Sequence, residues 1–247
     1  MSPTSTQQSQ AGAISSKRDV QQMFDTIVPR YDLMNHVMTL GMDFRWRRIV
    51  ANQAKTTATG PSDFAVDVAC GTGDVAFEME KVGIPLVTGL DYSPGMIAES
   101  QRKAKKHGSS VFFVEGDAMN MPFEDNAAGA ATISFGMRNL PDYAAGVKEM
   151  ARIVQPGGKV ICLEMTPYQR PFLKVPFNFY FRQVVPIIGW LLTRQYKAYK
   201  YLPESVKNFP TADEMVKIYH DAGLTDVTYN LLGFGTVALH VGTKPTT

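Results

Sequence analysis

The chain has 247 residues, of which 45% are hydrophobic and 19% charged, a composition that supports a buried core and excludes a disordered protein. The formal net charge is only +2, so the charge balance gives no sign of a nucleic-acid partner. The two cysteines, Cys70 and Cys162, each lie in an apolar run, which argues against a disulfide framework and favours a reducing compartment.

The beginning of the chain is polar. Residues 1–17 are rich in Ser, Thr and Gln, so we expect a disordered tail. This stretch lacks the apolar core of a signal peptide and the early basic residues of a transit peptide, and no run in the chain reaches the roughly 18 apolar residues of a membrane span. Two helical stripes follow, over 20–27 and 31–41, with Pro29 between them. We therefore predict a helical lid over residues 18–50.

From residue 63 onward, short apolar runs alternate with helical stretches. The expected strands cover 63–70, 85–92, 110–117, 130–137 and 159–166, and the expected helices include 94–107 and 143–155. Strands that alternate with helices predict a parallel, doubly wound α/β sheet, and continuous apolar strands fit burial on both faces. In the fourth run, Ala131, Ile133 and Phe135 have the character of buried strand residues.

The C-terminal part has a different pattern. Thr211 and Glu214 have the spacing of a capping box, which opens a helix that ends near Gly223. The segments 225–233 and 236–244 flank a glycine-containing turn and predict an antiparallel hairpin. The predicted sheet is therefore mostly parallel, with an antiparallel C-terminal hairpin strand.

The predicted strands end in polar residues, and ligands of open α/β sheets bind beyond the carboxyl ends of the strands. The first strand ends at Asp67 and runs into Gly71-Thr72-Gly73, where glycine lets the backbone turn tightly beside a ligand. The second ends at Asp91, twenty positions after Gly71, the spacing at which an acid holds both hydroxyls of a ribose. The third ends at Asp117-Ala118 and the fourth at Ser134.

Two ligand classes fit this pattern. The run from Gly71 to Ala76 matches G-x-G-x-x-A, so a dinucleotide oxidoreductase is one candidate. Asp74 falls at the expected helix start, and with the acids at the strand ends it disfavours a diphosphate. S-adenosylmethionine has no phosphate and a net positive charge, so an acidic rim favours it. Any single Asp after a strand can also be a helix cap or a turn residue.

Several segments together resemble the ubiquinone/menaquinone biosynthesis C-methyltransferase family. They are 24–48, 66–76, 116–126, 133–142 and 199–210. The motifs Tyr-Asp-x-x-Asn and Ser-Phe-Gly-x-Arg-Asn carry the resemblance beyond the glycine motif of class I methyltransferases in general. It implies a Rossmann-like fold and an enzyme that uses S-adenosylmethionine to methylate a ring carbon of a prenylated quinol.

The resemblance also implies roles for single residues. Thr72 lies in the glycine turn, Asp91 would hold the ribose, Asp117 and Ala118 would meet the adenine, and Ser134 would line the methionine part. The expected cofactor-binding set is Asp67, Gly71, Thr72, Gly73, Asp91, Tyr92, Asp117, Ala118 and Ser134. The chain departs from the family at Asp43, where many members have histidine, and at Cys70, where a small residue is common. No role for a histidine at position 43 is therefore carried over.

The expected catalytic residues are Arg138, Asn139 and Tyr31. A guanidinium is always protonated, so we expect Arg138 to stabilise a substrate phenolate and to hold a water that takes the proton. Asn139 would orient the substrate oxygen, and Tyr31 and Asn35 would contact the substrate from the lid. The alternative for Arg138 is a salt bridge at a helix start, with Asp142 as partner.

The segment 167–205 is aromatic and basic, and no acidic residue occurs between Glu164 and Glu204. Such a helical insertion is typical of an element that lies on an anionic bilayer; the alternatives are a lid or a dimer face. We expect a cytoplasmic bacterial protein that binds the inner face of the membrane transiently. The four histidines lack metal-ligand spacing, so no metal is expected.

The leading functional interpretation is the conversion of demethylmenaquinol to menaquinol. The alternative is methylation of 2-polyprenyl-6-methoxy-1,4-benzoquinol in the ubiquinone pathway, or an enzyme that serves both pathways. A non-catalytic cofactor-binding scaffold would bind S-adenosylmethionine without turnover. Residues 18–247 are expected to form a single methyltransferase domain, and a homodimer is left open.

Overall fold

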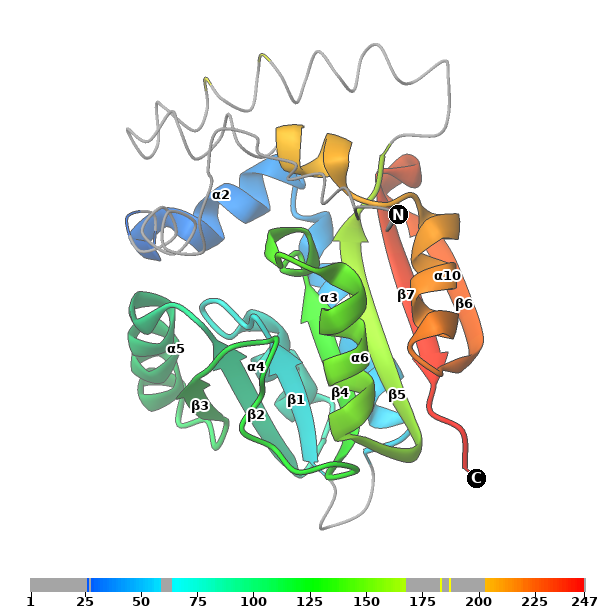
Figure 1. The fold of residues 1–247 in the computed structure, drawn as a ribbon. Helices are drawn as coiled ribbons and strands as arrows, with labels where there is room; N and C mark the ends of the chain where they lie inside the picture. Colours follow the sequence, from blue (N-terminus) through cyan, green and yellow to red (C-terminus); the bar gives the residue numbers. More distant parts are fainter. Residues whose placement is uncertain are drawn as a thin grey trace, which may run out of the picture.

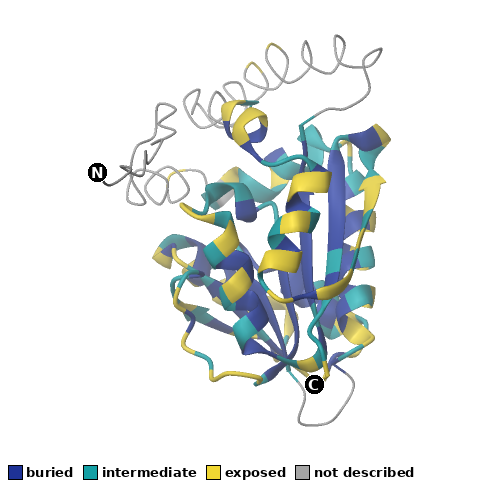
Figure 2. Ribbon diagram, turned by 45° about the vertical axis from the view of Figure 1, so that its right-hand side comes forward, coloured by how far each residue is buried: buried dark blue, intermediate teal, exposed yellow. Residues whose placement is uncertain are grey.

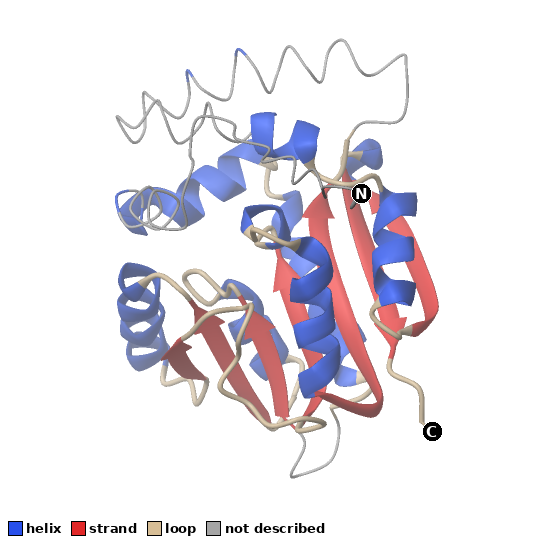
Figure 3. Ribbon diagram, in the orientation of Figure 1, coloured by secondary structure: helices blue, strands red, loops and turns tan. Residues whose placement is uncertain are grey.

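The computed structural model describes residues 26, 28–58, 64–167, 183, 187 and 203–246. The predicted tail, the helical stripe over 20–27 apart from Thr26, and nearly all of the aromatic and basic segment therefore lie outside the described residues. Within the described chain, a seven-stranded sheet has the order β3-β2-β1-β4-β5-β7-β6, as Figures 1 and 3 show. The strands are β1 (Phe64–Val68), β2 (Leu86–Asp91), β3 (Phe112–Glu115), β4 (Ala128–Ser134), β5 (Val154–Met165), β6 (Thr225–Leu232) and β7 (Val237–Thr243).

Strands β1 to β5 pair in parallel, whereas β7 is antiparallel to both β5 and β6. The helical elements used below are η1 (Val28–Arg30), α2 (Tyr31–Met38), α3 (Met42–Lys55), α4 (Asp74–Lys81), α5 (Pro94–His107), η2 (Met137–Asn139), α6 (Tyr143–Ile153), α10 (Ala212–Asp221) and η4 (Gly233–Gly235). The prediction of a doubly wound, mostly parallel sheet with an antiparallel C-terminal hairpin is confirmed.

Local sequence signals set several element boundaries. Helix α5 covers the predicted range, because the Ser93 side chain caps it and Pro94 occupies its first turn. The predicted capping box of Thr211 and Glu214 is present at the start of α10. The predicted helix 143–155 was too long, because Val154 already pairs with Ala128 of β4 and so begins β5.

Two apolar cores lie on the two faces of the sheet. On one face α3, α4 and α5 pack against strand residues such as Ile161, and on the other α6 and α10 pack against residues such as Cys162. Adjacent residues of β5 thus belong to opposite cores, as the alternation of a strand requires. Figure 2 shows the buried strands between helices whose outer faces are exposed. Among the described residues, no helix combines the length and the apolar character needed to cross a membrane.

Helix α3, which begins within the range 18–50, packs in the core. Its residues Trp46, Val50 and Ala54 recur every fourth position and are buried in the core against the sheet. The range 18–50 therefore includes most of a core helix. Only η1 and α2 of the described part of this range lie beyond the carboxyl ends of the strands (Figure 1).

A buried carboxylate joins β1 to its neighbours. Asp67 is 1% exposed and accepts a hydrogen bond of 2.8 Å from the Thr132 hydroxyl of β4. It also accepts one from the backbone of Ala76 in the first turn of α4. Burial raises the pKa of Asp67 from 3.8 to about 7, although these two hydrogen bonds oppose the rise.

We predict that Asp67→Asn changes how stability depends on pH. Between about pH 4 and pH 7 native Asp67 holds a proton that the unfolded chain has released, so wild-type stability falls as pH rises through this window. The variant lacks this fall, so relative to wild type it should gain up to about 4 kcal/mol by pH 8. Urea unfolding at several pH values measures the difference.

Thr132→Val is the companion variant. It removes a donor that favours the ionised form of Asp67, so the native pKa of Asp67 should rise and the pH-dependent window should extend to higher pH, while its lower limit stays the same. Parallel stability curves for wild type and Asp67→Asn across the whole pH range would contradict this account of Asp67.

Candidate active site

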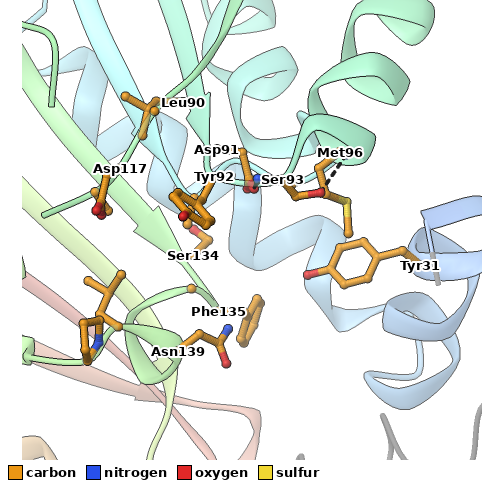
Figure 4. Close-up of a pocket in the computed structure, with 17 residues that line it drawn as sticks. Tyr31, Leu90, Asp91, Tyr92, Ser93, Met96, Asp117, Ser134, Phe135 and Asn139 are labelled. Atoms are coloured by element: carbon orange, nitrogen blue, oxygen red, sulfur yellow. Dashed lines mark hydrogen bonds between the residues drawn. The ribbon is translucent and has the colours of Figure 1, made fainter. Parts of the chain in front are cut away.

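A cavity lies at the carboxyl ends of β1, β2 and β4, beneath α2. Figure 4 shows Tyr31 at one side, with its hydroxyl directed into the cavity, and Asp117 at the opposite side. The carboxyl ends of three parallel strands converge here, as we expected from the polar residues at the predicted strand ends. The expected residues that line the cavity are Tyr31, Gly71, Asp91, Tyr92, Asp117, Ala118, Ser134 and Asn139.

Asp91 holds two loops of the cavity together. Its Oδ2 accepts a hydrogen bond of 2.7 Å from the backbone N–H of Gly71, and its Oδ1 accepts one of 2.9 Å from Ser93. Gly71 has a φ of +54°, and a Cβ there would lie 3.5 Å from the Tyr31 ring. Glycine therefore suits both the backbone conformation and the close approach of the ring. The carboxylate oxygens retain lone pairs for the hydroxyls of a ribose.

The far end of the cavity is built by the loop after β3. Asp117 Oδ1 accepts a hydrogen bond of 2.9 Å from the backbone N–H of Met119, which holds the carboxylate in place. The buried Ala118 lies beside it in the wall. A carboxylate next to a small apolar surface can accept a hydrogen bond from an adenine amino group while the ring packs against the wall.

Ser134 contributes a polar atom that protein groups leave unsatisfied. Its Oγ is buried and has no hydrogen-bond partner among the described residues, and the residue lines the cavity at the end of β4 (Figure 4). Buried hydroxyls in folded proteins normally have a partner. A ligand with a polar group at this point would supply it.

Two non-glycine residues with left-handed backbone flank Ser134 in space. Ala69 has a φ of 51° and Phe135 a φ of 58°, and both line the cavity. A Cβ on Gly136 would lie 2.7 Å from the Ala69 Cβ, so the ends of β1 and β4 approach closely there. The interpretation of Phe135 as a buried strand residue was wrong, because β4 ends at Ser134 and the backbone then turns the Phe135 ring to the cavity. Strained residues of this kind concentrate at functional sites.

Tyr31 is a neutral phenol under ordinary conditions. Burial raises its pKa, and a hydrogen bond with the Asn35 side chain and the positive charge of Arg138 oppose the rise only in part. The hydroxyl therefore keeps its proton and can donate a hydrogen bond to an oxygen in the cavity. Asn35 does not line the cavity itself and reaches it through Tyr31.

Arg138 lies behind the cavity wall. Its guanidinium forms a salt bridge with the Glu164 carboxylate, which is 1% exposed and comes from β5. Asp142 instead caps α6 through the backbone N–H of Ala145, so the predicted Asp142 partner was wrong. The neighbouring Asn139 does line the cavity.

Three other expected cofactor-binding residues also lie away from the cavity wall. Asp67 lies beneath the glycine turn, in the contacts described above. The Thr72 hydroxyl donates a hydrogen bond to Asp32 of α2 rather than facing the cavity. Gly73 has a φ of +90°, and a Cβ there would lie 2.6 Å from the Phe113 ring. These residues shape the turn that carries Gly71.

A partly buried ion network behind the glycine turn had no clear sequence signal. Lys103 of α5 contacts Asp32 at 3.0 Å and also pairs with Asp74, whose other oxygen lies 2.6 Å from Arg47. Thr72 accepts a hydrogen bond of 3.2 Å from the same Lys103. The network joins α2, α3, α4 and α5, and it neutralises Asp74, which the sequence had placed on the acidic rim.

Sequence reasoning missed several residues of the wall, among them Leu90, Ser93 and Met96. Ser93 had a usable signal, because a serine before proline marks a helix start. The apolar residues had none, since they are indistinguishable in the sequence from core positions.

The charge of the wall decides between the two ligand classes. Of the described residues that line the cavity, the only charged ones are Asp91 and Asp117. Two carboxylates without a lining cation disfavour a diphosphate and favour a ligand with net positive charge. The free Ser134 hydroxyl and the two acids fit S-adenosylmethionine. No group of three or more potential metal ligands occurs within the described ranges.

The chain is similar in sequence and in fold to known proteins. The chain is 41% identical to a demethylmenaquinone methyltransferase of Thermus thermophilus, over 90% of this chain and 100% of that protein. It is 39% identical to a demethylmenaquinone methyltransferase of Desulfitobacterium hafniense, over 92% of this chain and 90% of the relative. Among solved structures, the cyclase SpnF has a TM-score of 0.66 at 17% identity, covering 94% of this chain and 97% of that one.

The strand order and the antiparallel β7 are those of the class I S-adenosylmethionine-dependent methyltransferase fold, as the resemblance implied. The family model of the ubiE/COQ5 methyltransferases matches residues 12–244. The match extends over nearly the whole chain, and the relatives are covered almost end to end. The chain therefore belongs to the ubiE/COQ5 methyltransferase family.

Proposed function

We propose that the protein transfers a methyl group from S-adenosylmethionine to a ring carbon of demethylmenaquinol, which yields menaquinol. The observation that carries the proposal is a cavity whose charged wall residues, within the described part of the chain, are Asp91 and Asp117, and whose Ser134 hydroxyl has no partner there. The names of relatives at 39% and 41% identity support the choice of substrate.

The cavity divides into two functional ends. Asp91 accepts from the ribose hydroxyls, Asp117 accepts from the adenine amino group, and Ser134 contacts the methionine part. When bound, S-adenosylmethionine supplies an electrophilic methyl group on its sulfonium. The quinol ring then lies between Ser134 and Tyr31, the two residues on either side of the remaining space (Figure 4).

The chemistry requires an electron-rich ring. A ring carbon attacks a methyl group well only when the adjacent hydroxyl is deprotonated, and the ring proton leaves after the carbon–carbon bond has formed. Tyr31 donates a hydrogen bond to the resulting phenolate oxygen, because its raised pKa keeps the hydroxyl protonated. Asn139 orients the same oxygen from the opposite wall. Alignment of the two reactants supplies much of the rate.

Arg138 acts from behind this wall. Its positive charge opposes the rise that burial causes in the pKa of Tyr31. It therefore favours negative charge at that side of the cavity. Glu164 offsets part of this field, because it pairs with the guanidinium. Arg138 is accordingly a positioning and electrostatic residue that works through Tyr31. A water takes the proton of the substrate hydroxyl.

The prenylated substrate is embedded in a lipid bilayer, so the enzyme binds it at a membrane surface. We propose a cytoplasmic protein that binds the inner face of a bacterial membrane transiently. The acid-free segment between Glu164 and Glu204 supports this proposal.

The direct test of function is methyl transfer from labelled S-adenosylmethionine to reduced demethylmenaquinone. The product should carry the label, and the 2-polyprenyl-6-methoxy-1,4-benzoquinol analogue should react more slowly. A higher kcat/KM on the benzoquinol would assign the ubiquinone pathway instead. Cofactor binding in calorimetry without labelled product on either quinol would indicate a scaffold.

Ser134→Ala should move stability and binding in opposite directions. Loss of an unsatisfied buried hydroxyl should raise the stability of the ligand-free protein by about 1 kcal/mol. Loss of the cofactor contact should weaken S-adenosylmethionine binding by about tenfold. Thermal unfolding and calorimetry measure the two effects. Unchanged affinity would remove Ser134 from the cofactor site.

Arg138 requires a variant that preserves the fold. Arg138→Ala alone leaves the buried Glu164 charge unpaired, at a cost of about 3–5 kcal/mol. The double variant Arg138→Met with Glu164→Gln removes both charges while the glutamine oxygen can still accept from the Met165 backbone. We expect it to fold and to bind S-adenosylmethionine normally, with kcat reduced about a hundredfold. Wild-type kcat in this variant would reject the electrostatic role.

A further inference from the structure

The surface of the first helical hairpin has an unusual composition. We define the α2–α3 corner as residues 30–48, which comprise α2, the turn after it and the start of α3. Its exposed residues are Arg30, Leu33, Leu40, Phe44, Arg45 and Arg48. They are thus three large apolar side chains and three arginines, without an exposed acid or neutral polar residue among them.

The acids of the corner face inward and are neutralised. Asp43 is fully buried, where it contacts His36 at 2.7 Å and Arg47 at 3.0 Å and accepts a hydrogen bond from Thr39. Asp32 pairs with Lys103 in the network behind the glycine turn. The charged residues that the corner exposes are therefore all basic. Arg48 contacts Glu78 of α4 at 3.4 Å, whereas Arg45 forms no salt bridge within the described part of the chain.

Leu40 is held where neither folding nor packing favours a leucine. It has a φ of 52° and is 78% exposed. The left-handed conformation costs a residue with a Cβ about 1–2 kcal/mol, and an exposed side chain recovers none of this through burial. Asparagine or glycine would be more stable at this turn. Neither the backbone conformation nor burial in the monomer accounts for a leucine at this position.

The other two apolar residues extend the same surface. Phe44 is 58% exposed and its ring stacks on His36 at 4.3 Å, while Leu33 is 49% exposed on α2. The buried contacts of Asp43 hold the corner in one conformation, so these side chains are presented on a firm support. Apolar side chains surrounded by arginines match the interface of an anionic bilayer, where rings and leucines enter the acyl boundary and guanidinium groups contact phosphates.

We infer that the α2–α3 corner docks on the surface of an anionic lipid bilayer. The same helix α2 carries Tyr31 into the cavity, so docking brings the quinol side of the cavity close to the membrane. Docking follows from the surface itself, and its use for substrate capture rests on the proposed function.

Vesicle co-sedimentation tests the docking. Wild type, Leu40→Asn and Arg45→Glu are mixed with vesicles of phosphatidylcholine alone and with vesicles that contain about one-third phosphatidylglycerol. Wild type should bind the anionic vesicles, and each variant should bind them about tenfold more weakly. Leu40→Asn should also unfold at the same or a higher temperature than wild type, because asparagine tolerates the left-handed conformation. A destabilised Leu40→Asn would assign Leu40 a structural role and overturn the inference.

Matched controls lie elsewhere on the molecule. Phe112→Ser removes an aromatic ring that is 65% exposed on β3, and Lys148→Glu reverses an exposed charge on α6; both should bind vesicles like wild type. Equal binding by wild type and the two corner variants would overturn the inference. A change in the oligomeric state of the corner variants without a change in vesicle binding would also overturn the inference, because the corner would then be a protein interface.

A second assay separates this inference from the proposed function. Methyl transfer is measured on a water-soluble short-chain quinol and on a long-chain quinol in vesicles. The corner variants should match wild type on the first and lose about tenfold in kcat/KM on the second. If the wild-type protein binds vesicles but methylates neither quinol, the proposed function is rejected and the docking inference stands.

Discussion

The two hydrogen bonds of the Asp91 carboxylate set the geometry on which the site depends. One oxygen holds the glycine turn after β1 and the other holds the start of α5. A single side chain thereby fixes the distance between two loops that approach from different strands. Both donors are backbone N–H groups, and the carboxylate oxygens still have lone pairs for a ligand. The position of Gly71, and with it the room for the Tyr31 ring, follows from this anchor.

Charge is distributed unevenly around that anchor. The acids that line the cavity have no lining cation among the described residues, whereas the acids behind the glycine turn are paired with Lys103 and Arg47. The fold thus separates the negatively charged cavity from the ion network behind the glycine turn, in which the acids are paired with bases. This separation matters for chemistry, because a positively charged ligand is attracted to the cavity, while the supporting network keeps its salt bridges away from it.

Left-handed backbone at non-glycine residues occurs both at the cavity and at the corner. Ala69 and Phe135 have left-handed backbone at the cavity, and Leu40 has it on the surface of the corner. In each place a residue with a Cβ occupies a conformation that it disfavours. Well-packed neighbours, such as Asp43 and its partners beneath the corner, offset the free-energy cost of this backbone conformation. Tyr31 connects the two regions, since its helix forms part of the corner and its ring enters the cavity.

The sequence by itself determined the order of strands and helices, the capping of α5 and α10, and the presence of acids at the strand ends. These features depend on hydrophobic periodicity and on turn and cap residues, which are local properties of the chain. The common direction of parallel strands then brings Asp91, Asp117 and Ser134 to one edge, so the polar strand-end residues of the cavity wall followed from the pattern.

Only the tertiary structure decided which partner each polar side chain meets. Arg138 pairs with Glu164 because β4 and β5 are neighbours in the sheet, and Thr72 turns to Asp32 because α2 lies against the glycine turn. Phe135 faces the cavity because its backbone leaves the strand with a positive φ. Such contacts join residues far apart in the chain or depend on a single dihedral angle. Local pattern does not encode them, since the energy that selects them arises only when the sheet has formed.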